Sequence, residues 1–214
     1  MSTETEPVMG LRESKKHETR QLISDHATRL FIEKGFEATT IADVAAASRV
    51  AKKTVTNYFA RKEDMALDHQ EEFVAGLART VADRAVGESV LAALRREFLD
   101  GVERQDPVIG FAGERFTRMI ADSPTLTARL RDLHDQREEA LGRVLAGEAG
   151  TDADDFAAYA VAAQLGAAQR VLFQRIMRLT LAGRPADDIA ATVADDARRV
   201  FGLLEGSFGK YGVR

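Results

Sequence analysis

The sequence predicts an all-α protein with about nine helices. Apolar side chains recur at helical spacing in one segment after another, which is the pattern of helices that bury one face. The segments are separated by glycine, by proline, or by a hydroxyl or acidic side chain that can cap the next helix. No stretch alternates apolar and polar residues as a strand does, and no repeat or low-complexity tract stands out.

The first two helices are each bounded by their own signals. Apolar residues spaced i, i+4, i+7 and i+8 predict a helix from Ser14 to Lys34, and Gly35 then stands in the C′ position. Thr40 has a hydroxyl that can cap the next helix, and Asp43 lies three residues later, where a capping-box acid belongs. The second helix is therefore expected to begin directly after Thr40.

The stretch that follows has the layout of a helix-turn-helix. The residues Ser48-Arg49-Val50 break the apolar pattern, and a second apolar face then runs through Val55 to Phe59. The outward side carries the cations, hydroxyls and amide that contact phosphates and base edges in a major groove. These residues are Lys52, Lys53, Thr54, Thr56 and Asn57. The pattern therefore predicts that the third helix reads double-stranded DNA.

Six more helices are expected in the remainder of the chain. Their expected ranges are 62–85, 89–105, 108–121, 124–146, 154–182 and 187–208. Breaks are indicated at Asp106-Pro107, Ser123-Pro124 and Gly183-Arg184-Pro185, because proline is accommodated only in the first turn of a helix.

Charge divides the chain into two parts. Residues 12–62 hold eleven Lys and Arg against six Asp and Glu, a balance of +5, so the overall charge of -4 leaves -9 elsewhere. A basic domain on an acidic body fits a DNA reader joined to another module, although chance clustering would give the same asymmetry. We expect a disordered tail at residues 1–11, a DNA-binding domain at 12–60 and a helical regulatory and dimerisation domain at 61–214.

The N-terminal region resembles the DNA-binding domain of the TetR-type repressors. The resemblance covers roughly a quarter of the chain, and the combination of residues is highly specific. The matching residues are Leu30-Phe31, Lys34-Gly35-Phe36, Thr39-Thr40, Ile41, Val44-Ala45, Val50, Thr54, Asn57-Tyr58-Phe59 and Lys62-Glu63. The remainder matches only in length and helical character.

Two residues depart from the habit of that family. Arg49 stands where the turn usually has glycine, so a left-handed backbone there would be costly. Ala51 stands where serine usually caps the reading helix, so that cap is missing or comes from Ser48. The resemblance implies phosphate contacts by Thr40, Tyr58 and Lys62, and Arg49 is counted among the expected DNA contacts.

Two long helices are expected to form the interface of a homodimer. The helix at 154–182 is apolar on two stripes and rich in small residues, and the last helix has a long apolar face. The functional interpretation is a four-helix bundle across a two-fold axis, and the alternative is burial of both helices within one subunit. Predicted interface residues are Val161, Leu165, Ala168, Leu172, Ile176, Val193, Val200 and Leu204.

A pocket for a small-molecule effector is expected in the body, where most aromatic residues gather. Packed core is the alternative explanation for aromatic residues at helical spacing. Predicted ligand contacts are Phe98, Phe111, Arg115, Phe116, Met119, Tyr159, Gln169 and Phe173, with Arg137, Gln164 and Arg170 as further polar groups nearby. The body is faintly similar to family members that sense acyl-thioester-like molecules.

Nothing in the sequence indicates an enzyme, a metal or a cofactor. The four histidines lack metal-ligand spacing, and no motif of a hydrolase, nucleotide or dinucleotide site occurs. There are no cysteines, which fits a reducing interior, and no apolar run approaches the ~20 residues of a membrane span. Residues 1–11 also lack the order of a secretion signal, so we expect a cytoplasmic protein with no membrane partner.

We therefore predict a ligand-responsive transcriptional regulator, a repressor that binds a palindromic operator as a homodimer. Two alternatives remain open at this point. One is an architectural DNA-binding protein without a ligand, which a fully packed body would support. The other is a helical small-molecule-binding protein or enzyme whose DNA-binding domain is vestigial.

Overall fold

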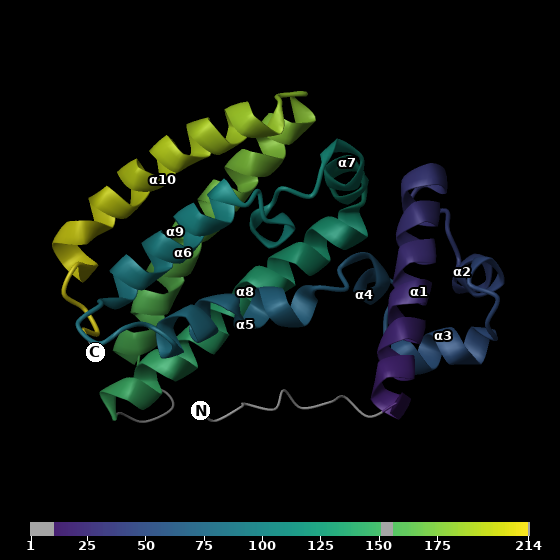
Figure 1. The fold of residues 1–214 in the computed structure, drawn as a ribbon, viewed down its shortest axis with the longest axis horizontal. Helices are drawn as coiled ribbons and strands as arrows, with labels where there is room; N and C mark the ends of the chain where they lie inside the picture. Colours follow the sequence, from purple (N-terminus) through teal and green to yellow (C-terminus); the bar gives the residue numbers. More distant parts are fainter. Residues whose placement is uncertain (1–10, 151–155, 214) are drawn as a thin grey trace, which may run out of the picture. The chain divides into compact units, whose positions relative to one another are not determined.

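A computed structural model describes residues 11–150 and 156–213 of the chain. Within these ranges the structure holds ten α-helices and one 3-10 turn, and no strand (Figure 1). This confirms the all-α prediction. The residues pack as two units, one that ends at Asp68 and one that begins at His69.

The N-terminal unit is built on one long helix. It contains α1 (Leu11–Lys34), α2 (Ile41–Ala47), α3 (Lys52–Tyr58) and α4 (Glu63–Ala66). Helix α1 packs against α2 and α4, and α2 packs against α3. The apolar stripe of α1 is buried at Ile23 and Phe31, and the ring of Phe36 lies 4.8 Å from that of Phe31. Burial of these side chains holds the short helices, which are too short to be stable alone.

The prediction of one continuous helix at 62–85 is wrong. The structure divides it into α4, which ends at Ala66, and α5 (Gln70–Ala82). Met65 and Ala66 are buried, and the hydroxyl of Ser24 on α1 donates to Met65 O at 2.9 Å and to an oxygen of the Asp68 carboxylate at 2.6 Å. These contacts belong to the N-terminal unit, which therefore continues to Asp68 instead of ending near residue 60.

The C-terminal unit is a helical body. Its elements are α5, α6 (Val90–Glu103), the 3-10 turn η1 (Pro107–Ile109), α7 (Glu114–Asp122), α8 (Pro124–Ala149), α9 (Phe156–Leu181) and α10 (Ala186–Phe208). Helix α8 packs against α5 and α9, and α10 packs against α6 and α9 (Figure 1). Within the described ranges no helix is both long and apolar enough to cross a bilayer.

The helix predicted at 108–121 is shorter than expected. Residues Pro107–Ile109 form only a 3-10 turn, and α7 begins at Glu114. Gly110 and Gly113 separate the two elements, with φ angles of 121° and 78° that a helix cannot contain. Helix α8 starts as predicted, because the hydroxyl of Ser123 accepts a hydrogen bond from Leu126 N at 3.1 Å. The expected tail lies almost entirely outside the described residues, since α1 already begins at Leu11.

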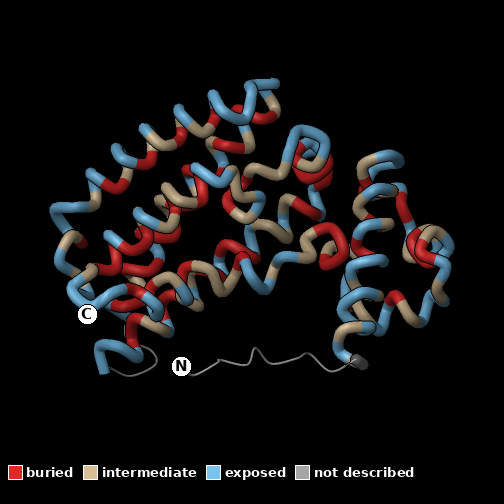
Figure 2. Tube along the Cα trace, in the orientation of Figure 1, coloured by how far each residue is buried: buried red, intermediate tan, exposed pale blue. Residues whose placement is uncertain are grey.

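Most of the apolar stripe predicted for a dimer interface lies inside one subunit. Leu165, Leu172, Ile176 and Val193 are at most 1% exposed, and Val161 is also buried. Figure 2 shows buried positions recurring along α9 and α10. These five side chains therefore belong to the core of one subunit, and a place for them in a dimer interface stays a prediction. The predicted residues Ala168, Val200 and Leu204 are half-buried.

Candidate functional site

The N-terminus of α2 is closed by a complete capping box. The hydroxyl of Thr40 accepts a hydrogen bond from Asp43 N at 3.2 Å, and the Asp43 carboxylate accepts one from Thr40 N at 2.8 Å. The Thr40 hydroxyl also donates to that carboxylate at 2.7 Å, and its hydrogen bond is the main reason that the pKa of Asp43 is lowered. The Thr40 hydroxyl is thus engaged within the helix cap, and its contact with phosphate stays a prediction.

The turn between α2 and α3 is a Schellman motif with arginine in the usual glycine position. Arg49 has a φ of 55°, and its N–H donates to Ala46 O at 3.2 Å. Val50 N donates to Ala45 O at 3.0 Å, which is the second hydrogen bond of the motif. The left-handed backbone therefore persists at a non-glycine residue, at a cost of about 1–2 kcal/mol. This turn sets the direction in which α3 leaves α2.

The reading helix has no side-chain cap. Ala51 has the extended backbone of an N-cap residue, with no side-chain hydrogen bond to the first turn of α3. Ser48 does not supply the cap either, because it is buried and its hydroxyl oxygen accepts no hydrogen bond from the described residues. Of the two possibilities that the sequence left open, the missing cap is the one observed.

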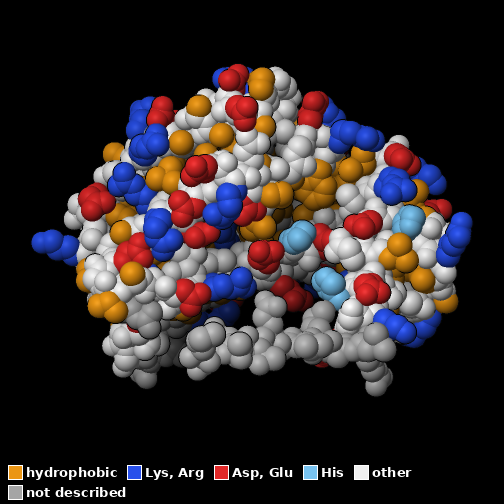
Figure 3. Space-filling view, in the orientation of Figure 1, with side chains coloured by type: hydrophobic (Ala, Val, Ile, Leu, Met, Phe, Trp, Pro, Cys, Tyr) orange, Lys and Arg blue, Asp and Glu red, His pale blue; other side chains and the backbone are white. Residues whose placement is uncertain are grey.

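The outward face of α3 is polar and accessible. Val55 is fully buried and Phe59 is 3% exposed, so the inner side of the helix is fixed against the unit. The predicted base-contacting residues Lys52, Lys53, Thr56 and Asn57 are all exposed, and Thr54 and Tyr58 are half-buried. Figure 3 shows Lys and Arg side chains on the face of the unit that carries α2 and α3. A short rigid helix that presents cations and amides suits insertion into a major groove.

Two cations hold the unit together in a way that sequence reasoning missed. Arg20 on α1 donates to Tyr58 O at 2.7 Å, and its guanidinium lies 4.3 Å from the ring centroid of Phe59. Lys62 donates to Phe36 O at 2.8 Å and to Thr39 O at 3.1 Å. Arg20 thus binds the carbonyl at the end of α3, and Lys62 binds two carbonyls of the connection between α1 and α2. Neither contact is signalled by the spacing of residues in the sequence. The phosphate contact expected of Lys62 stays a prediction, but its ammonium already has two acceptors.

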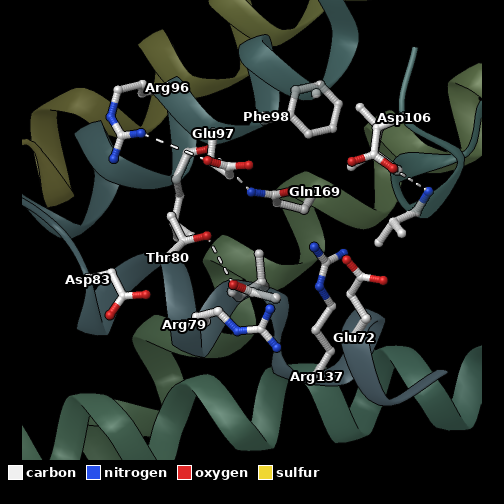
Figure 4. Close-up of a pocket in the computed structure, with 16 residues that line it drawn as sticks. Glu72, Arg79, Thr80, Asp83, Arg96, Glu97, Phe98, Asp106, Arg137 and Gln169 are labelled. Carbon is white, nitrogen blue, oxygen red and sulfur yellow. Dashed lines mark hydrogen bonds and ion pairs between the residues drawn. The ribbon is translucent and has the colours of Figure 1, made fainter. Parts of the chain in front are cut away.

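The body contains a cavity of about 330 Å³ that is lined by α5, α6, α8, α9 and the turn η1 (Figure 4). Of the eight predicted ligand contacts, Phe98 and Gln169 line it. The other six do not: Phe111, Arg115, Phe116, Met119, Tyr159 and Phe173. Three of these residues lie on α7, which contributes no residue to the lining, and Tyr159 packs its ring against Gly142. Phe98 and Gln169 thus line this cavity, and contact of any of the eight residues with a ligand stays a prediction.

Arg137 is the one lining residue that is both charged and buried. It is 6% exposed, and its guanidinium lies 4.6 Å from the ring centroid of Phe73. Its buried Nε has no hydrogen-bond partner, and among the described residues no carboxylate oxygen lies within 4 Å of its guanidinium. Burial lowers the pKa of Arg137 to about 10, against a smaller opposing effect of Glu138. The group therefore stays cationic at neutral pH.

A buried histidine stands beside this arginine. The ring of His134 makes edge-on contacts with Phe73 and Phe173, at centroid distances of 5.0 and 5.2 Å. Burial first, and then the charges of Arg137 and Arg170, lower the pKa of His134 to about 4. His134 is therefore neutral at pH 7 and packs as an aromatic side chain. No group of His, Asp or Glu with the arrangement of a metal site occurs in residues 11–150 or 156–213.

Two comparisons of the sequence with known proteins both find bacterial transcriptional regulators. The family described as "Bacterial regulatory proteins, tetR family" matches residues 23–68, which span α2, α3 and α4. The HTH-type transcriptional regulator TcmR of Streptomyces glaucescens is 30% identical over 151 residues, which are 68% of this chain and 67% of TcmR.

Solved structures share the fold at lower identity. The structure of SmeT in complex with triclosan aligns with a TM-score of 0.57 at 18% identity, over 92% of this chain and 94% of SmeT. NalD of Pseudomonas aeruginosa, the secondary repressor of the MexAB-OprM multidrug efflux pump, aligns with a TM-score of 0.52 at 17% identity, over 87% and 97% of the two chains. These two likenesses concern the arrangement of the helices alone.

Proposed function

Because the chain belongs to the TetR family of DNA-binding transcriptional regulators, we propose that it is a homodimeric repressor released from its operator by a small effector. The relatives are regulators and not enzymes, so no reaction has to be assigned. The proposal rests on a combination of two features. The C-terminal unit contains a cavity, and the outer face of α3 in the N-terminal unit is exposed. The cavity also counts against the architectural alternative, which required a fully packed body.

In the proposed complex the exposed face of α3 lies in a major groove. Lys52, Lys53, Thr56 and Asn57 contact base edges, and Thr54 contributes at the edge of this face. Phosphate contacts come from Arg49, Tyr58, Thr40 and Lys62 around it. The pattern supports this assignment because cations and amides read guanine and adenine edges, while hydroxyls serve either base or phosphate.

The short length of the reading helix α3 supports the proposed dimer. Helix α3 has seven residues and is about 10 Å long, so one copy contacts only a few base pairs. Two copies related by a two-fold axis, about 34 Å apart, give useful affinity for a palindromic site. The support for a partner surface is an apolar outer face on α9 and α10, where Leu203 is 84% and Val171 is 51% exposed. A shallow groove on this face also includes the predicted interface residue Val200.

The effector is proposed to be compact and largely apolar. A cavity of about 330 Å³ lies at the lower end of the ~300–1,000 Å³ usual for ligand pockets. This size favours a ring system or short chain over an acyl thioester, whose nucleotide part would have to remain outside. SmeT, which shares the fold, has been solved with triclosan, a small molecule of this general kind.

Release works only if the effector binds one arrangement of the dimer better than the other. A coupling free energy of about 1–3 kcal/mol is usual for such regulators and corresponds to roughly 5–150-fold in DNA affinity. The same factor applies in reverse, so operator DNA weakens effector binding to the same extent.

The test is binding of the purified protein to the DNA upstream of its own gene, against an unrelated duplex, at about 150 mM salt. We expect tight, selective binding by the wild type and loss of selectivity in the double variant Lys52→Ala, Lys53→Ala. Arg29→Ala removes one exposed cation from α1, outside the reading helix, and serves as the control. Equal, weak binding of the wild type to both duplexes would contradict the proposed reader.

A further inference from the structure

The unpaired cation in the body cavity indicates what kind of effector fits. We propose that the effector is an anion, and that the guanidinium of Arg137 pairs with its acidic group. This inference rests on the proposed function, because it assumes that the cavity takes a ligand. It goes further by assigning the chemical class of that ligand and the residue that selects it.

The first step is the cost of burying a charge without a partner. A guanidinium removed from water is unfavourable unless a carboxylate or several acceptors compensate it. The nearest acidic neighbour on the same helix, Glu138, pairs instead with Arg170 at 3.0 Å. Arg137 therefore has no counter-ion among the described residues, although it is 94% buried. A bound anion would supply the missing charge.

The second step is the direction of the side chain. Figure 4 shows Arg137 extending from α8 into the space bounded by Gln169, Glu72 and Arg79. On the side of α5 there is no side chain at Gly76, where an added Cβ would lie 3.6 Å from a terminal nitrogen of Arg137. The ring of Phe73 covers one face of the guanidinium. The planar group is thus held in place, and its N–H groups are left for a ligand.

The third step is that the acidic residues around the cavity are occupied or exposed. Glu97 pairs with Arg104 at 3.3 Å, and Asp106 accepts a hydrogen bond from Val108 N at 2.8 Å. Glu72 and Asp83 are exposed to solvent, where water screens their charge. None of these four carboxylates comes within 4 Å of the buried guanidinium. The inner part of the cavity is therefore positive.

The chemistry of the site defines the ligand class. A guanidinium presents two parallel N–H groups that match the two oxygens of a carboxylate, or two of the three oxygens of a sulfonate, in a bidentate manner. Leu77, Leu94, Phe98 and Ile109 supply apolar walls for a ring or short chain. The amide of Gln169 donates only a long hydrogen bond of 3.5 Å to Leu94 O, so it can reorient toward a polar ligand atom. A compact aromatic or aliphatic acid fits all three features.

The test uses two fluorescent probes that differ only in the acid. Anilinonaphthalene sulfonate carries the anion, and phenylnaphthylamine has the same ring system without it. Both are titrated into the wild type, Arg137→Met, Arg137→Lys and the control Arg131→Met, which changes an exposed arginine on the same helix. Operator binding is measured on the same samples, so the state of the reader is known in each.

We expect the wild type and Arg131→Met to bind the sulfonate more tightly than the neutral probe. Arg137→Met should lose about 10- to 100-fold in sulfonate affinity, because a charge-assisted hydrogen-bonded pair is removed, and should keep the neutral probe. Arg137→Lys should lie between them, since it keeps the charge without the planar fork.

Equal binding of both probes by the wild type, unchanged in Arg137→Met, would overturn the anion inference and leave a ligand-binding body in place. Binding of neither probe would overturn it together with the effector part of the proposed function. Selective operator binding in the same samples would still support the DNA reader, so the failures can be told apart.

Discussion

Replacing Arg137 with methionine should stabilise the protein when no effector is present. Burial lowers the pKa of Arg137 well below its ordinary value, to about 10, and each pKa unit corresponds to 1.36 kcal/mol. The fold therefore disfavours the charged side chain by about 3 kcal/mol. Methionine keeps most of the apolar stem and removes the charge.

One favourable contact is lost at the same time. The guanidinium lies over the Phe73 ring at 4.6 Å, and a cation–π contact of this kind contributes about 0.5–2 kcal/mol. The net expectation is a gain of about 1–3 kcal/mol in the free energy of unfolding. Replacing a side chain of a binding site often stabilises a protein, because such side chains serve function at a cost in stability.

The assay is urea unfolding of the ligand-free protein at pH 7, followed by circular dichroism at a fixed protein concentration. Arg131→Met is the control, and its stability should stay within about 0.5 kcal/mol of the wild type because the side chain is exposed. A loss of more than about 1 kcal/mol in Arg137→Met, with the control unchanged, would refute the reasoning. It would mean that water or another part of the chain already compensates the buried charge.

Three further predictions concern other features of the fold. Ala51→Ser should add the missing cap of α3 and stabilise the N-terminal unit by about 1 kcal/mol, seen as slower amide hydrogen exchange in α3, whereas Ala60→Ser should have no such effect. Gly142→Ala should be about 1–3 kcal/mol less stable than Gly147→Ala in urea unfolding, because the Cβ added at Gly142 would lie 2.5 Å from an atom of the Tyr159 ring, whereas the one added at Gly147 would meet nothing within 4 Å; equal stabilities would show that the ring moves freely. Between pH 6.5 and about 4, the imidazole of His134 binds a proton in the unfolded protein but not in the folded protein. The free energy of unfolding of the wild type should therefore fall by about 3 kcal/mol relative to that of His134→Leu as the pH is lowered through this window. Equal pH dependence of the two unfolding free energies would contradict a buried neutral histidine.

Local signals predicted the DNA-binding unit well. Thr40 and Asp43 form the expected capping box, and Arg49 adopts the left-handed backbone that its place in the turn required. These features depend on residues a few positions apart, so the sequence contains all that determines them. The contacts of Arg20 with Tyr58 O and of Lys62 with Phe36 O and Thr39 O join residues far apart in the sequence, and no spacing in the chain indicates them.

The body was harder to predict because one helical pattern fits two kinds of burial. The stripe with Leu165 and Leu172 is apolar at helical spacing, whether it faces a second subunit or the core of its own. Arg137, the arginine of the proposed effector site, is buried although its sequence context predicts an exposed residue. An arginine in a helix rich in charged residues is usually solvent-exposed, and only the packing of α5 and α9 around α8 buries this one.

The two cations that bond to backbone carbonyls change how the charge of the N-terminal unit should be counted. Neutralised phosphates release bound ions, and the slope of log affinity against log salt concentration measures how many. Arg20 and Lys62 contribute to the +5 balance but already have protein acceptors. Arg20 is therefore expected to add nothing to the number of ions released per subunit on operator binding, and Lys62 adds to that number only if its ammonium leaves these two carbonyls for a phosphate.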